Sequence, residues 1–165
     1  MSDLDIRPAC EGELDLVETL LKGASEWLAS RGIDQWQYPP DRDRIAQGIG
    51  RRECFLAFRD GLAVATIQVD DYADPEFWQE GDRPDVAMYV HRMAVSRSVA
   101  GQDIGSELLI WAAQHTAEVG RPLLRLDAWK DNAGLHSYYG SQGFELVRIV
   151  DLPHRQSGAL FQRAT

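Results

Sequence analysis

The sequence has few cysteines, no long apolar run and a shortage of positive charge. Cys10 and Cys54 are the only cysteines, and their spacing fits neither a disulfide framework nor a metal site. No stretch approaches the roughly 20 apolar residues that a membrane-spanning helix needs, and the first residues lack the basic and apolar regions of a secretion signal. We therefore expect a cytoplasmic protein with no metal ion and no membrane partner.

The excess of acidic residues limits the choice of partner. Lysine and arginine total 17 against 26 aspartates and glutamates, which gives a formal net charge of −9 at pH 7. Nucleic-acid binding needs a positively charged surface, so we expect no nucleic-acid partner. An acidic surface attracts cationic small molecules such as amines, but it also serves solubility alone in many cytoplasmic proteins.

The length and the apolar pattern predict one domain of the α/β class. The 165 residues, 44% of them apolar, suffice for a single core over residues 1–165, and they contain no internal repeat. Asp60-Gly61 predicts a tight hairpin turn, and 70–85 is expected to be an exposed acidic loop. Periodicity predicts helices over 14–28, 42–49, 106–116 and 132–142, and strands over 4–8, 54–58, 62–69, 86–95, 123–129, 144–150 and 159–162. This order favours a mixed sheet flanked by helices, antiparallel at first and joined later by helical crossovers.

A strand, a glycine-containing loop and a helix follow one another in the middle of the chain. Met93-Ala94-Val95 ends a strand, the loop runs from Ser96 to Gly105, and the helix is expected to begin at Ser106. The first amides of a helix have no partner within it and carry partial positive charge, so such a turn suits a pyrophosphate. Many strand-to-helix turns contain glycine and bind nothing, so this motif by itself leaves both interpretations open.

A second motif lies downstream. The strand 123–129 leads into Asn132-Ala133, and the helix then passes Tyr139 to Gly143-Phe144. Taken together, these two motifs resemble the acetyl-CoA-binding core of the GCN5-related N-acetyltransferase (GNAT) family over roughly residues 86–150. Residues 93–95 and 101–109 resemble its fourth strand, pyrophosphate loop and third helix, and 132–144 resembles its fourth-helix motif.

The resemblance implies a fold, a co-substrate and roles for individual residues. It implies a mixed, mostly antiparallel sheet whose central parallel strands splay, with the pantetheine arm of acetyl-CoA between them. Tyr139 would be the general acid near the thioester sulfur, and Asn132 would bond the cofactor arm. Backbone groups of Met93, Ala94 and Val95 would pair with that arm, and the pyrophosphate would be held by amides of Gly101, Gln102, Asp103, Ile104, Gly105 and Ser106.

The pyrophosphate loop departs from the family pattern at two positions. The family places Arg or Gln, then Gly, then Gly or Ala where this chain has Ala100, Asp103 and Gly105. Ala100 removes a guanidinium from the phosphate site, and the Asp103 carboxylate would repel a polyanion. Asp103 also has a structural interpretation as the residue that caps the helix.

The resemblance also implies direct attack of an amine on the thioester in a ternary complex. For the general base, His91 is the first candidate because histidine has an intrinsic pKa near neutrality, and Asp127 on the neighbouring strand is the second. His91 should share a strand face with Met93. Water could instead carry the proton away, and His91 could be purely structural.

Aromatic residues are the candidates for the acceptor pocket. Trp27, Trp36, Tyr38 and Trp129 could receive an ammonium group or a flat ring, although packing in the core or on the surface is the commoner role of such residues. We expect a small-molecule amine as the acceptor. The alternatives are a protein N-terminus or lysine, and a catalytically weak CoA-binding or sensor module. A homodimer is possible.

Overall fold

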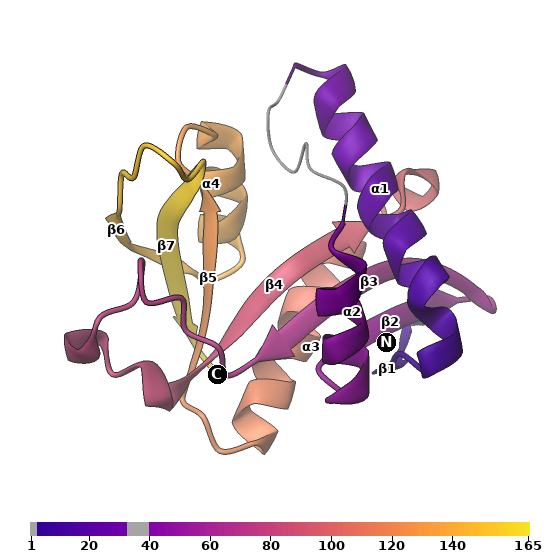
Figure 1. Cartoon of the computed structure of the whole chain (residues 1–165), viewed down its shortest axis with the longest axis horizontal. Helices are drawn as coiled ribbons and strands as arrows, with labels where there is room; N and C mark the ends of the chain where they lie inside the picture. Colours follow the sequence, from indigo (N-terminus) through magenta and orange to yellow (C-terminus); the bar gives the residue numbers. More distant parts are fainter. Residues whose placement is uncertain (1–2, 33–39) are drawn as a thin grey trace. The chain divides into compact units, whose positions relative to one another are not determined.

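The computed structural model describes residues 3–32 and 40–165, which form a mixed sheet with helices (Figure 1). The strands are β1 (Asp5–Pro8), β2 (Cys54–Arg59), β3 (Leu62–Asp70), β4 (Ala87–Val95), β5 (Leu123–Trp129), β6 (Glu145–Ile149) and β7 (Ser157–Ala164). The α-helices are α1 (Leu14–Ser30), α2 (Arg42–Gly50), α3 (Ile104–Glu118) and α4 (Ala133–Ser141). Along the sheet the strand order is β1-β2-β3-β4-β5-β7-β6.

The pairing of the strands confirms the predicted α/β class. Strands β1, β2 and β3 pair antiparallel, and so do β5 with β7 and β7 with β6. Strands β4 and β5 form a parallel pair in which Ala87 lies opposite Leu123 and Tyr89 opposite Arg125. A parallel pair needs a long crossover, and α3 supplies it between these two strands.

The chain divides into two compact units. The first comprises Met1–Val69 and His91–Leu108, and the second comprises Asp70–Val90 and Leu109–Thr165. In the first unit, α1 and α2 pack against β2 and bury a core of apolar side chains (Figure 1). That core contains Ala9, Val17, Leu20, Leu21, Ile45, Ile49, Cys54, Leu56 and Ala94. The apolar stripe predicted for the first helix therefore faces a sheet, as its periodicity requires.

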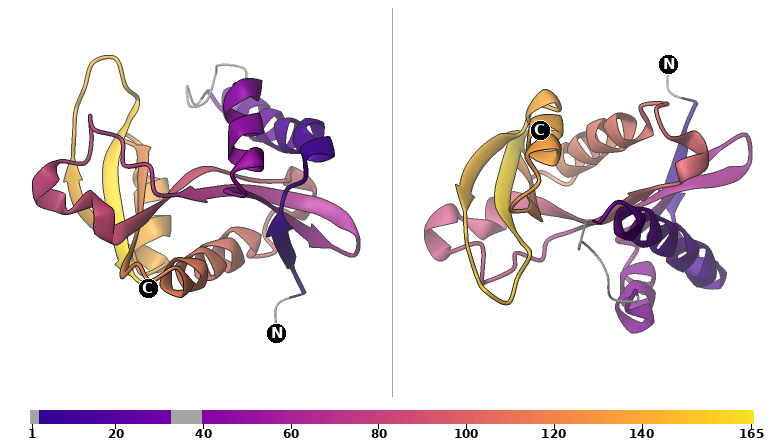
Figure 2. Two further views of the ribbon diagram at one scale, coloured as in Figure 1. Left: turned by 60° about the horizontal axis from the view of Figure 1, so that its bottom comes forward. Right: turned by 90° about the horizontal axis from the view of Figure 1, so that it is seen from above.

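The second unit has its own core. Helix α4 contacts β5 and β6 (Figure 2). A cluster of buried side chains joins the segment before β4 to β4 and β7, and it consists of Phe77, Trp78, Ala87, Tyr89 and Leu160. The prediction that 70–85 is an exposed loop is therefore wrong in part, because Phe77 and Trp78 are buried in this cluster. The acidic composition of the segment suggested exposure, although these two aromatic side chains are buried.

Arginines fasten the same segment to β5 and β6. Arg125, which is buried, donates to the carbonyl oxygen of Asp82 at 2.6 Å and lies 4.6 Å from the centre of the Trp78 ring. Arg148 donates to both carboxylate oxygens of Asp82, at 2.6 and 2.8 Å. The Arg148 guanidinium, with the backbone amide of Gln79, lowers the pKa of the Asp82 carboxyl to about 2. The segment is thus held by charge-assisted hydrogen bonds as well as by burial.

Most local predictions are confirmed to within a residue or two. Asp60 and Gly61 both have positive φ (52° and 78°), as the tight turn between β2 and β3 requires. Helix α3 begins at Ile104, two residues earlier than expected. In the part of the chain that the structure describes, no helix is both long and apolar enough to cross a membrane.

Candidate functional site

The end of β4 belongs to the first unit and contains an irregularity. Arg92 has φ 48°, a left-handed conformation that is unusual for a residue without glycine's freedom. Its side chain donates to Oε1 of Gln68 at 2.8 Å. Because the backbone at Arg92 leaves strand geometry, the alternation of faces cannot be carried from Met93 back to His91. The prediction that His91 and Met93 share a face therefore loses its basis.

The loop that follows β4 leads into the first turn of α3. Gly101 (φ 80°) and Asp103 (φ 59°) are left-handed, and residues 101–103 are exposed. A side chain added at Gly101 would meet nothing within 4 Å, so the loop is open on that side. The backbone amide of Glu107 donates to the Asp103 carbonyl at 3.1 Å, which makes it the first i→i−4 bond of the helix.

The amides just before Glu107 are the ones that a phosphate would use. Ile104, Gly105 and Ser106 precede the first intrahelical bond, so the helix itself supplies no acceptor for their N–H groups. Asp103 directly precedes α3, and its backbone carbonyl accepts from Glu107; whether its side chain caps the helix stays a prediction. The exposed loop, its two left-handed residues and these amides together offer the kind of donors that a diphosphate needs.

Trp27, one of the aromatic candidates for acceptor binding, contacts arginines in the first unit. The guanidinium of Arg97 lies 3.9 Å from the centre of a Trp27 ring, and that of Arg31 lies 4.8 Å away. Arg97 belongs to the loop before Gly101, so Trp27 supports that loop through a cation–π contact. Trp36 and Tyr38 lie outside the described residues.

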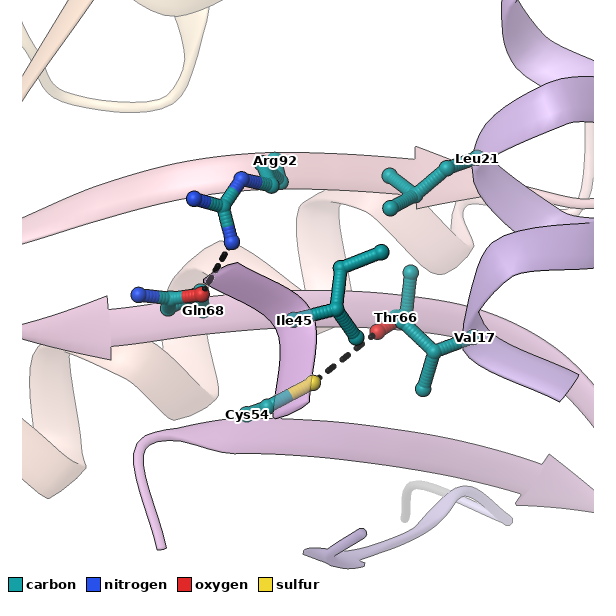
Figure 3. Close-up of a pocket in the computed structure, with 7 residues that line it drawn as sticks. All are labelled: Val17, Leu21, Ile45, Cys54, Thr66, Gln68 and Arg92. Atoms are coloured by element: carbon teal, nitrogen blue, oxygen red, sulfur yellow. Dashed lines mark hydrogen bonds between the residues drawn. The ribbon is translucent and has the colours of Figure 1, made fainter. Parts of the chain in front are cut away.

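A narrow pocket in the first unit lies between α1, α2 and the strands (Figure 3). Its lining consists of Val17, Leu21, Ile45, Cys54, Thr66, Gln68 and Arg92. Burial raises the pKa of the Cys54 thiol, so this cysteine stays protonated and is a poor nucleophile near neutral pH. In Figure 3 the Gln68–Arg92 pair forms the polar end of an otherwise mostly apolar group.

The remaining candidates belong to the second unit. The hydroxyl of Ser157 donates a short hydrogen bond to Oδ2 of Asp127, across the β5–β7 pair. Burial raises the pKa of the Tyr139 phenol well above its ordinary value of 10, and the charges of Tyr138 and Asp127 raise it further. Tyr139 therefore keeps its proton throughout the physiological range.

The ring of Tyr139 is fixed by aromatic neighbours. Its centre lies 5.8 Å from that of Phe144, edge to face, and 5.6 Å from that of Phe161. Tyr138 lies 5.5 Å away in a tilted arrangement. These contacts orient the phenol through the ring rather than through its hydroxyl.

Asn132 and Trp129 have structural partners that the sequence did not reveal. Oδ1 of Asn132 accepts from the Leu135 amide at 2.9 Å and so caps α4. Trp129 Nε1 donates to Oε1 of Gln156 at 3.1 Å, and its carbonyl accepts from His136 Nε2 at 2.8 Å. His136 follows Asn132 by one helical turn and could have been noticed. Gln156 and Ser157 carry no sequence signal, because the fold brings them to β5 from about 30 residues away.

Comparison with known proteins decides the family. The model of the acetyltransferase (GNAT) family matches residues 19–144, more than half of the chain. This chain belongs to the GNAT family. The uncharacterized N-acetyltransferase YesJ of Bacillus subtilis is 30% identical to it over 146 residues, which cover 85% of this chain and 81% of that protein. The protein is accordingly a GNAT-type acyltransferase that depends on acetyl-CoA.

Solved GNAT structures share the fold. An acetyltransferase of this family from Listeria monocytogenes superposes with a TM-score of 0.82 at 22% identity, and covers 98% of this chain and 95% of its own. The PaiA N-acetyltransferase of Thermoplasma acidophilum, solved in complex with coenzyme A, has a TM-score of 0.76 at 17% identity, with both chains fully covered. Among the described residues of this GNAT protein, no group of three or more His, Cys, Asp or Glu side chains could hold a metal ion.

Proposed function

We propose that this GNAT protein transfers the acetyl group of acetyl-CoA to the amine of a small molecule by direct attack in a ternary complex. The observation that carries the proposal is the open loop 101–103, in which Gly101 and Asp103 are left-handed, and which leads directly into the first turn of α3, where the helix supplies no acceptor for its first amides. A diphosphate requires such donors, and the loop leaves room for it. Bound acetyl-CoA supplies the activated thioester carbonyl and the thiolate leaving group.

The cofactor contacts are proposed for the residues that match the family motif. Backbone groups of 93–95 would hold the pantetheine arm as an added strand would. The amides of 101–106 would hold the diphosphate. Asn132 would donate its side-chain amide to the arm, since its Oδ1 accepts from Leu135 within the cap. Each of these proposed roles uses hydrogen-bond donors or acceptors that the end of β4, the start of α3 or the start of α4 presents by itself.

Tyr139 is proposed as the general acid. Its raised pKa keeps the phenol protonated, so it can donate to the thiolate as the carbon–sulfur bond breaks. The proton on the attacking nitrogen needs a separate acceptor. His91 and Asp127 are the two candidates, and the Ser157 hydroxyl orients the Asp127 carboxylate by donating to one of its oxygens. Water is the third possibility.

The acceptor class rests on charge and aromatic residues. The net charge of −9 favours a cationic partner. Trp129 in the second unit and Trp27 in the first are the described aromatic candidates for contact with it. A thiol-release assay with a panel of amines tests this: turnover of small amines supports the proposal, while turnover only of peptide amines indicates a protein acceptor. CoA binding without any turnover would indicate a sensor module. The cytoplasmic location and a homodimer stay predictions.

Hydrogen–deuterium exchange tests the proposed cofactor site directly. Addition of 1 mM acetyl-CoA should slow exchange in a peptide that contains residues 101–106, because the bound diphosphate occupies the exposed amides. Peptides from α2 (Arg42–Gly50), which no proposed cofactor contact involves, serve as the internal control and should not change. Unaltered exchange at 101–106, even at millimolar acetyl-CoA, would contradict the proposed site.

Asp103→Gly is expected to bind CoA equally or more tightly and to be slightly more stable. Glycine adopts φ 59° without strain, and the substitution removes a carboxylate from the anion site. If the Asp103 side chain caps α3, its loss offsets only part of this gain, because glycine is tolerated at an N-cap. Isothermal titration calorimetry with CoA measures the first effect, and thermal unfolding measures the second. A clear rise in Kd would show that Asp103 assists binding.

A further inference from the structure

We infer that Arg59 is a positioning residue for the coenzyme A diphosphate, and that it compensates for the guanidinium that the loop lacks at Ala100. This inference rests on the proposed function, because it assumes that the start of α3 receives the diphosphate. Arg59 ends β2, 41 residues before Ala100 in the sequence, and belongs to no GNAT motif discussed above. It lies beside the loop because the fold places the end of β2 there, and not because the two are close in sequence.

The contacts of Arg59 are with the loop and with the first turn of α3. Nη1 donates to Oε1 of Gln102 at 3.1 Å, and Nη2 donates to Oε1 of Glu107 at 3.4 Å. Both partners lie in or beside the segment proposed to hold the diphosphate. One guanidinium therefore links the β2–β3 hairpin to both sides of Asp103.

Burial limits the alternatives open to this side chain. Arg59 and Glu107 expose only 22% and 28% of their side chains, so the ion pair is screened less by water than a surface pair. Nε of Arg59 is buried and has no hydrogen-bond partner among the described residues. A buried N–H without a partner is unfavourable. The guanidinium keeps this position nevertheless, which indicates that its hydrogen bonds with Gln102 and Glu107 hold it there.

The charges in the first turn explain why such a residue is needed. Asp103 and Glu107 place two carboxylates at the helix start, where they interact favourably with the helix dipole but repel a diphosphate. Arg59 neutralises Glu107 and adds a positive charge beside the loop. Without it, the diphosphate would face two carboxylates and no guanidinium at position 100. Neutralisation of Glu107 is thus the main contribution of Arg59.

A double-mutant cycle tests this contribution. Arg59→Gln should raise the Kd for CoA about tenfold, because the positive charge beside the loop and its ion pair with Glu107 are lost. Glu107→Gln alone should bind CoA equally or more tightly, and the double variant should return to within about threefold of the wild-type Kd. Arg44→Gln is the matched control, because it removes the same charge from an exposed position on α2 in the same unit. A Kd for Arg59→Gln within twofold of the wild type, or a double variant as weak as Arg59→Gln, would overturn the inference.

A second substrate separates positioning from a general structural defect. Acetyl-pantetheine carries the thioester but no diphosphate, so its KM should be the same in the wild type and in Arg59→Gln, while the KM for acetyl-CoA rises. An equal rise for both substrates would mean that the substitution merely damages the fold and would contradict the inference. The proposed function fails separately, if the wild type itself shows no exchange protection by acetyl-CoA.

Discussion

Tyr139→Phe is expected to lower kcat by about 10²-fold while the KM for acetyl-CoA stays within about twofold. The substitution keeps the ring and its contacts with Phe144 and Phe161, and it removes only the hydroxyl proposed to protonate the thiolate. Steady-state thiol release with the best amine from the panel measures the effect. An unchanged kcat would exclude Tyr139 as the acid.

Tyr138→Phe is the matched control, because the same hydroxyl is removed from the neighbouring residue, 5.5 Å away between ring centres. It should retain nearly full activity. The pH profile adds an independent check. Since burial raises the pKa of Tyr139, the phenol should remain protonated beyond pH 10, and it should contribute no alkaline fall in kcat below that pH. The wild type should therefore lose activity at high pH only through other groups or through unfolding.

Gly158→Ala is expected to destabilise the protein by about 3 kcal/mol or more. Gly158 has φ 150°, and a Cβ there would lie 2.1 Å from the carbonyl oxygen of Val150, so the backbone would have to move. The Val150 amide also donates to the Gly158 carbonyl at 2.8 Å, and that bond would be disturbed. A loss of this size corresponds to a fall in Tm of roughly 6–12 °C in a protein of this length, measurable by differential scanning calorimetry.

Gly140→Ala provides the control in the same unit. Gly140 lies in α4, and a Cβ there would meet nothing within 4 Å. Alanine is a better helix former than glycine, so this variant should be equally stable or more stable by up to about 1 kcal/mol. If Gly158→Ala unfolds at the same temperature as the wild type, the close approach to Val150 does not exist in solution.

Periodicity was sufficient to predict the elements and their order. The stripe of Val17, Leu20 and Leu21 predicted an amphipathic helix, and these side chains are buried in the first unit. Asp60-Gly61 predicted its turn because few residue pairs tolerate positive φ twice in succession. The family motifs indicated the loop at 101–106 and the helix that carries Tyr139, whose functional roles stay predictions.

Long-range contacts could not be predicted in this way. Phe77 and Trp78 lie in a run of acidic and polar residues, so local composition indicated exposure, whereas contacts with β4 and β7 bury them. Arg59 reaches Gln102 and Glu107 only because the β2–β3 hairpin lies beside the loop. The left-handed Arg92 breaks a run that reads as a regular strand. In each case the structure depends either on a contact with a residue distant in sequence or on a backbone angle that the residue type does not predict.

The hydrogen bond that caps α4 also affects which hydrogen bonds the Asn132 side chain can make to a ligand. Its oxygen accepts from the Leu135 amide, and the NH₂ group of the carboxamide takes no part in that cap. In the proposed contact with the cofactor arm, this NH₂ group would donate to a carbonyl oxygen of the pantetheine chain while the capping bond stays intact. Aspartate would cap the helix equally well yet has no N–H to donate, so asparagine is the residue that could combine the cap with the proposed contact.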